Sequence, residues 1–140
     1  MGHRLKLEEV SCEIVPARTR ARVQLRNSGL THVGLASSRT EDEAWQSVVA
    51  QATVNAVRMF VGFAGADLRL ALEGVSVISQ PLPVVLVSLT AGGEGQQLLL
   101  IGSAPVEDDP QRAVAKAVLD ALNRKLERIS PVDPRTPASN

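Results

Sequence analysis

The chain has 140 residues, which is enough for one domain with its own core, and 44% of them are hydrophobic. Lys and Arg together number 15, and so do Asp and Glu, so the chain has no net charge that would attract nucleic acid or an anionic membrane. Aromatic residues make up only 2%, which weakens any role that needs stacking platforms for bases, and the single cysteine, Cys12, excludes an intrachain disulfide.

The first half of the chain predicts three strands. Apolar and polar residues alternate over 6–15 and again over 19–26, which is typical of strands with one buried face. The sequence Asn27-Ser28-Gly29 predicts a turn, and a third strand is expected over 31–36.

The second half repeats this plan, with strands expected over 70–79, 84–90 and 97–102. The last of these strands contains Leu98-Leu99-Leu100-Ile101, where apolar residues follow one another without alternation. Such a run is typical of a strand that is covered on both faces, so we expect a cover from within the domain or from a partner.

A helix is predicted after each set of three strands. Thr40 and Glu43 have the spacing of a capping box, and apolar residues then recur every three or four positions over about 41–61. Asp109 and Pro110 suit the N-cap and first turn of a second helix that extends to about residue 129.

The two halves also share sequence. Residues 5–16 and 70–81 are identical at six of twelve positions, where composition alone would give roughly one identity. The two predicted helices match at the same offset of 65 residues, and Leu35-Ala36-Ser37 matches Ile101-Gly102-Ser103 within one residue of it. We therefore predict an α+β fold made of two β-β-β-α units, with two three-stranded antiparallel sheets and one helix on each. The units span about 4–62 and 68–129 of a single domain over 1–130, and residues 131–140 are predicted to be a disordered tail.

No pattern in the sequence predicts catalysis, a cofactor or a metal site. His3 and His32 are the only histidines, and no pair of His and Cys residues has the spacing of metal ligands. Neither a nucleophile motif nor a phosphate-binding loop is present. The longest apolar run, 82–89, is far shorter than a membrane span, and no apolar signal core begins the chain, so we expect a cytoplasmic protein without a membrane role.

Four arginines in the second predicted strand leave two interpretations open. Arg18, Arg20 and Arg22 point to one face of the strand, and Arg26 follows them. They could form a ridge that binds RNA or another anion. They could equally form a solvated face that prevents association between sheet edges. Zero net charge and the absence of interleaved aromatics favour the solvated face and make nucleic acid an improbable partner.

A domain of six strands and two helices can leave a sheet face or edge uncovered, and proteins usually bury such a surface by dimerising. We therefore expect a homodimer. A small enzyme whose site forms at the dimer interface is a further alternative.

The closest local likeness to a known family lies at the end of the second unit. Leu99-Leu100-Ile101-Gly102-Ser103-Ala104 is followed by a short acidic stretch and then by the alanine-rich segment 113–124, which ends near Ala121-Leu122-Asn123. In this segment and in its doubled β-β-β-α plan, the chain resembles the C-terminal regulatory domain of alpha-isopropylmalate synthase and the related citramalate synthases. The resemblance spans about residues 4–129.

The resemblance implies a free-standing regulatory module without the catalytic barrel of those enzymes. It implies a dimer that binds a small amino-acid-like ligand near its interface, through turns that follow the third strand of each unit, and that acts on a partner enzyme. The corresponding residues here are Ser37, Ser38, Gly102, Ser103 and Ala104. Gly102 matches a family glycine, whereas Ala36, Ser38 and Ala104 stand where further glycines would be expected.

Overall fold

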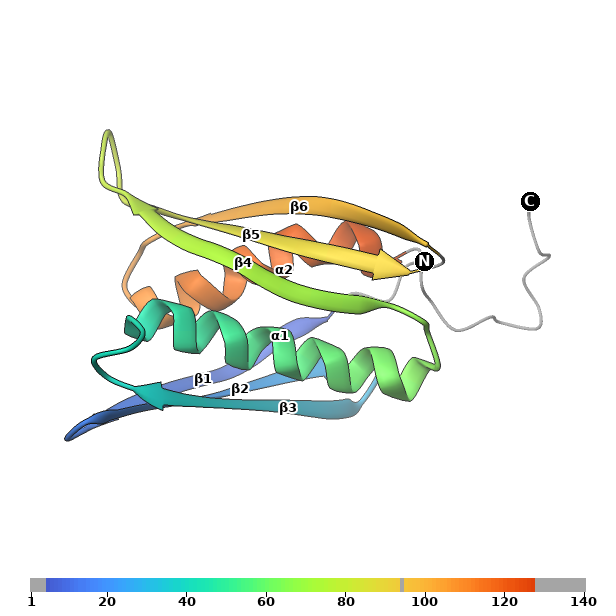
Figure 1. Ribbon diagram of the computed structural model, residues 1–140, viewed down its shortest axis with the longest axis horizontal. Helices are drawn as coiled ribbons and strands as arrows, with labels where there is room; N and C mark the ends of the chain where they lie inside the picture. The colour runs from blue at the N-terminus through green and yellow to red at the C-terminus, as the bar shows by residue number, and fades with distance from the viewer. Residues whose placement is uncertain (1–4, 94, 128–140) are drawn as a thin grey trace.

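The computed structural model describes residues 5–93 and 95–127, so the predicted tail at 131–140 lies outside the described residues. Six strands and two helices follow one another in the order predicted from the sequence (Figure 1). The elements are β1 (Lys6–Val15), β2 (Arg18–Asn27), β3 (Leu30–Arg39), α1 (Trp45–Ala64), β4 (Arg69–Ile78), β5 (Val84–Gly93), β6 (Gln96–Pro105) and α2 (Pro110–Glu127).

The strands form two antiparallel sheets, and both helices lie between them. The first sheet has the order β1-β2-β3 and the second the order β4-β5-β6. Helix α1 packs on β2 and β3, and α2 packs on β5 and β6 (Figure 1). Each helix also reaches the other sheet, because α1 contacts β4 and α2 contacts β1. The predicted α+β fold of duplicated units is therefore confirmed, and each sheet has an inner face on the helices and an outer face turned away from them.

The core between the sheets is aliphatic, as the composition requires. The inner residues of β2 and β5 are buried at alternate positions, among them Val23 and Leu25 on β2 and Val87 and Leu89 on β5. Helix α1 is buried on most of its sides, since it packs against both sheets and α2. By length and composition alone α1 could span a membrane, but a core helix of this kind meets the same criteria.

The duplication is visible in the backbone as well as in the sequence. Each first hairpin has an irregularity at the same place, between Leu7 and Glu9 in β1–β2 and between Leu72 and Gly74 in β4–β5. The strand register corrects one part of the predicted alignment. Gly34 lies opposite Val23 and Gly102 lies opposite Val87, so these two glycines are the equivalent residues.

The predicted match between Leu35-Ala36-Ser37 and Ile101-Gly102-Ser103 is therefore wrong. Between the paired residues Val87 and Gly102 the chain is four residues longer than between Val23 and Gly34, which moves the third strands out of the offset that the rest of the repeat keeps. Both equivalent glycines lie directly against a helix. A Cβ on Gly34 would collide with the backbone of Ala52 and Ala56, and a Cβ on Gly102 would collide with that of Ala117 and Ala121. The helix residues that the two glycines contact, Ala52 and Ala56 on α1 and Ala117 and Ala121 on α2, are 65 residues apart in the sequence. The two helices therefore correspond at the predicted offset.

The starts of the two helices differ from each other. Helix α2 begins as predicted, since the Asp109 carboxylate accepts hydrogen bonds from the backbone N–H groups of Gln111 (2.9 Å) and Arg112 (3.3 Å). The capping box predicted for α1 is wrong. The N–H groups of Asp42 and Glu43 donate to the Arg39 carbonyl in a turn, and α1 starts only at Trp45, without a side-chain cap.

Candidate functional site

The five residues that the resemblance implies for ligand binding lie in strands, not in the turns where they were expected. Ser37 and Ser38 belong to β3, which continues to Arg39 because the ladder with β2 runs along its whole length. Gly102, Ser103 and Ala104 belong to β6, which continues to Pro105.

These residues do not come together in one site. The two strands belong to different sheets. Ser37 lines a shallow hollow with Arg20 and Leu35, whereas Ser103 and Ala104 line a groove beside α2. Gly102 is buried under α2, so its smallness serves the approach of strand and helix.

The reactive side chains of the described residues are held apart. Cys12 lies on β1 opposite Ala21, and burial raises the pKa of its thiol. His32 lies on β3 opposite Leu25 and packs against the edge of Phe60, and burial lowers the pKa of its imidazole. Strand β2 separates the two, so they do not form a thiol–imidazole pair. Within the described ranges, no group of three His, Cys, Asp or Glu side chains is placed to hold a metal ion.

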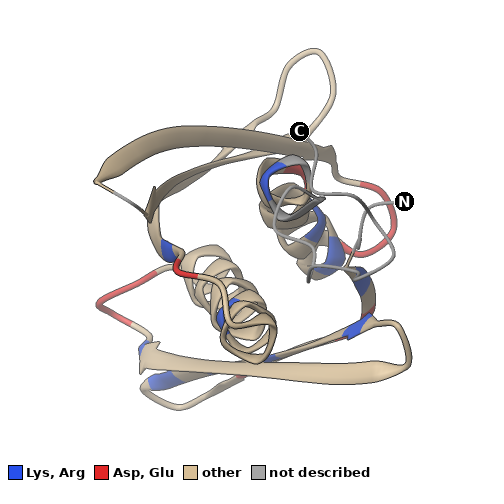
Figure 2. Cartoon of the chain, turned by 90° about the vertical axis from the view of Figure 1, so that its right-hand side faces the viewer, with Lys and Arg blue, Asp and Glu red and all other residues tan. Residues whose placement is uncertain are grey.

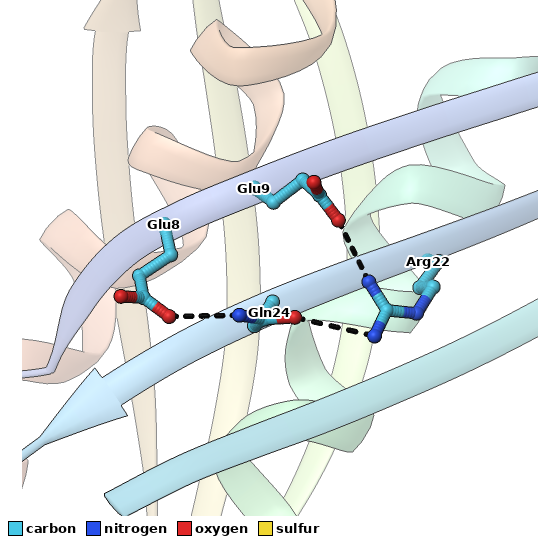
Figure 3. Close-up of polar contacts among 4 residues, drawn as sticks. All are labelled: Glu8, Glu9, Arg22 and Gln24. Atoms are coloured by element: carbon cyan, nitrogen blue, oxygen red, sulfur yellow. Dashed lines mark hydrogen bonds and ion pairs between the residues drawn. The ribbon is translucent and has the colours of Figure 1, made fainter. Parts of the chain in front are cut away.

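The four arginines of β2 lie on the outer face of the first sheet, and two of them are neutralised there. Arg22 pairs with Glu9 at 2.8 Å, and Arg26 pairs with Glu8 at 2.6 Å. Gln24 joins the two pairs, because it donates to Glu8 and accepts from Arg22 (Figure 3). The arrangement is that of a solvated, mixed-charge sheet face, not of a continuous cationic ridge.

Of the other two arginines, Arg18 donates a hydrogen bond to the Ser37 hydroxyl at 3.2 Å. Arg20 lies opposite Glu13 on β1 and opposite Ser37 on β3. Both arginines are exposed. Any anion-binding role of this strand would therefore depend on these two arginines, which form no ion pair with the described residues.

The outer face of the second sheet is different in kind. Because Val85, Val87 and Leu89 face the helices, the alternate residues of β5 face outward. This outer face is uncharged over most of its area, and on it apolar side chains alternate with Ser76, Ser88, Thr90 and Ser103. We call it the apolar face after its apolar members: Ile78, Val84, Leu86, Leu99, Ile101 and Pro105. Leu99 and Ile101 are 62% and 65% exposed, so no residue in the described ranges covers this side of the run that was expected to be covered on both faces.

The charged residues divide between the sheets in the same way. The strands of the first sheet carry nine charged residues, whereas those of the second carry two, Arg69 and Glu73, both in the first half of β4. In Figure 2 the second sheet is accordingly almost entirely tan, while Lys and Arg mark the first. Since the two sheets have the same strand lengths and topology, the difference does not come from the fold.

The outer face of the second sheet is close to the size that a protein interface needs. The whole outer face of the second sheet, with three strands of ten residues at about 3.3 Å per residue and about 4.8 Å between strands, projects an area of roughly 450 Å², and the six apolar residues occupy part of it. Two such faces in contact bury close to the roughly 1,000 Å² that a specific protein interface needs, since side chains add relief to the plane. The sequence pointed to this surface only through the run at 98–101, and it missed Ile78 and Leu86, which join that run through strand register.

Two comparisons with known proteins found no relative of this chain. A scan against models of known protein families gives no match, and a search of curated proteins finds none that matches the sequence.

Proposed function

We propose that this chain is a non-catalytic, cytoplasmic, homodimeric module that associates through the apolar face of its second sheet. The observation that carries the proposal is the contrast between two sheets of the same architecture, one outer face being charged and the other apolar. Exposed apolar side chains gathered on one uncharged sheet face are typical of interaction sites.

A second copy of the chain is the partner that fits this face best. In a twofold dimer the same patch meets itself, so a charged patch would bring like charges together. The first sheet would place arginine against arginine, whereas Leu86, Leu99 and Ile101 can meet their own copies without electrostatic cost. The charged outer face of the first sheet then stays in solvent and limits association to a closed pair.

The resemblance to an amino-acid-binding regulatory domain supports a regulatory or scaffolding role for such a dimer. A thermal-shift screen against free amino acids and related 2-oxo acids tests the ligand that the resemblance implies. A ligand at 100 times its dissociation constant raises the free energy of unfolding by roughly 2.7 kcal/mol.

The dimer itself is tested by sedimentation equilibrium of matched variants. Ile101→Glu places a carboxylate on the apolar face, midway along the edge strand β6, and Leu35→Glu places one on the outer face of the first sheet at nearly the same exposure (65% and 64%). We expect Ile101→Glu to raise the dimer dissociation constant at least 30-fold, or about 2 kcal/mol, because each protomer then buries a charge in the interface. Leu35→Glu should leave it within about twofold.

A third variant distinguishes the apolar face from the flank of α1. Phe63 is 66% exposed on α1, away from both outer faces. If Phe63→Glu dissociates the dimer and Ile101→Glu does not, the association belongs to the helix flank. A monomeric wild-type protein at micromolar concentration would overturn the dimer altogether.

A further inference from the structure

A groove runs along α2 between the free edges of two strands that belong to different sheets. Strand β1 supplies Lys6 and Leu7, strand β6 supplies Ser103 and its neighbours, and the exposed side of α2 forms the floor. The groove is shallow and open to solvent, with a volume of about 430 Å³. We call it the α2 groove.

The walls of the α2 groove carry more positive than negative charge. Lys6, Arg112 and Lys116 line it, together with one carboxylate, Asp120. Asp120 is already engaged, because it accepts a hydrogen bond from the backbone N–H of Ser103 at 3.0 Å. None of the three cations forms an ion pair within the described part of the chain.

The cations come from two elements that are fixed relative to each other. Arg112 on α2 donates a long hydrogen bond to the Leu7 carbonyl of β1 at 3.5 Å. Lys116 follows one helical turn later on the same side of α2. The three cations therefore line one groove, although they come from two elements.

Asn123 gives the groove a second polar feature. It lies farther along α2, is only 7% exposed, and lines the same groove. Its side-chain Oδ1 is buried without a hydrogen-bond partner among the residues that the structure describes. Buried polar groups in folded proteins are nearly always paired, so an unpartnered amide beside a groove is a place where a ligand could supply the missing hydrogen bond.

The duplicated half of the protein provides an internal reference for these residues. At the offset of 65 residues that relates the helices, the counterparts of Arg112 and Lys116 are Ser47 and Gln51. The counterpart of Lys6 on β4 is Ala71. Gln51 is satisfied within the chain, since it donates to Asn55 at 3.0 Å. The fold itself does not require cations at these three positions, although the equivalent flank of α1 carries Arg58 at the counterpart of Asn123, where it donates to the Leu70 carbonyl.

We propose that the α2 groove binds a small dianion, either a dicarboxylate or a phosphate monoester, through Lys6, Arg112 and Lys116. Three cations against one engaged carboxylate favour a ligand with two negative charges over a zwitterion. A hydroxyl or other donor on the ligand would satisfy the amide oxygen of Asn123 once this side chain turns toward the groove, because the oxygen is buried in this structure. This inference supplies the ligand class for the small-molecule role of the proposed module and does not depend on its dimerisation.

Acidic residues near the α2 groove limit its affinity for an anion. On the other side of Arg112 and Lys116, the acidic residues 107–109 line a neighbouring hollow that shares these two cations. Their negative charge opposes the positive field of the groove. We therefore expect weak binding that declines with added salt.

The test is a titration of the full chain followed by ¹H–¹⁵N NMR, with succinate, inorganic phosphate and a zwitterionic amino acid as probes. Chloride at matched ionic strength is the reference. The expected result is a saturable shift of the amide signals of Ser103, Lys116 and Asn123 with succinate, with phosphate or with both, and little response to the amino acid. Which of the two dianions binds more tightly separates a dicarboxylate from a phosphate ester.

Lys116→Gln introduces the residue that the equivalent position of α1 already holds, and its side chain is exposed, so the fold should tolerate it. Arg20→Gln on the first sheet removes the same charge far from the groove and is the matched control. We expect Lys116→Gln to weaken dianion binding about fivefold, or roughly 1 kcal/mol, and Arg20→Gln to leave it unchanged.

Equal weakening by both variants, or no saturable shift with either dianion, would overturn the groove as a site. Repeating the titration on Ile101→Glu keeps the two proposals apart. If the Ile101→Glu protein is a monomer and still binds the dianion, the groove is a site that does not depend on dimerisation. If the wild-type protein is a dimer but binds neither dianion, the groove is not a site, and the proposed dimeric module is unaffected.

Discussion

The substitution Gly102→Ala distinguishes two possible roles of Gly102, contact with a ligand and close packing of β6 against α2. The resemblance implies a ligand-binding glycine, whereas the structure buries Gly102 where β6 crosses α2. A Cβ at this position would overlap the carbonyl oxygen of Ala117 and the backbone nitrogen of Ala121. Backbone atoms cannot rotate away, so the helix or the strand must move.

The cost of Gly102→Ala follows from that collision. Overpacking a well-packed core costs typically 1–3 kcal/mol, and a contact with rigid backbone belongs at the upper end, near 3 kcal/mol. The entropy of unfolding is about 2.1 cal/mol/K per residue, or roughly 0.3 kcal/mol/K for a chain of this length. The melting temperature should therefore fall by about 10 °C in a thermal unfolding scan.

A glycine without such a contact provides the control. Gly62 is exposed near the end of α1, and a Cβ there would meet nothing within 4 Å. Gly62→Ala should raise the free energy of unfolding by roughly 0.5–1 kcal/mol, because alanine favours the helix. A Gly102→Ala protein that melts within about 2 °C of the wild type would refute the close packing and return Gly102 to the candidates for ligand contact.

The strands and helices could be predicted because their signals are local. Alternation over β1 and β2, the turn at Asn27-Ser28-Gly29 and the Asp109 cap each act within a few residues, and the duplication made each half a check on the other. Where local signals were weak, tertiary contacts decided. Ser37-Ser38-Arg39 carry no apolar pattern, yet they are strand residues because β2 begins at Arg18 and pairs with Arg39.

The surfaces could be predicted only in part. The uncovered run at Leu99 and Ile101 was visible in the sequence, but its junction with Leu86 requires the register of β5 and β6. The α2 groove could not be predicted, because Lys6 and Lys116 are brought together by the packing of α2 against β1. No spacing along the chain encodes that contact.

Two further substitutions test buried polar groups that lack partners in the described part of the chain. Burial lowers the pKa of His32 below 6.5, so the unfolded chain takes up a proton that the folded chain excludes. The free energy of unfolding should therefore be flat above about pH 6.5 and fall below it, by at most about 1.4 kcal/mol per pH unit. His32→Leu should flatten this slope between pH 6.5 and 5 in urea titrations, and an unchanged slope would assign it to other groups. At Asn123, the unpaired Oδ1 costs roughly 1–3 kcal/mol, whereas leucine has a similar volume and no polar atom to satisfy. Asn123→Leu should consequently leave the free energy of unfolding unchanged or raise it by about 1 kcal/mol, while dianion binding to the α2 groove weakens. A loss of more than about 1 kcal/mol in the same urea titration would show that the amide supports the fold, and its place at the groove would then need no ligand to explain it.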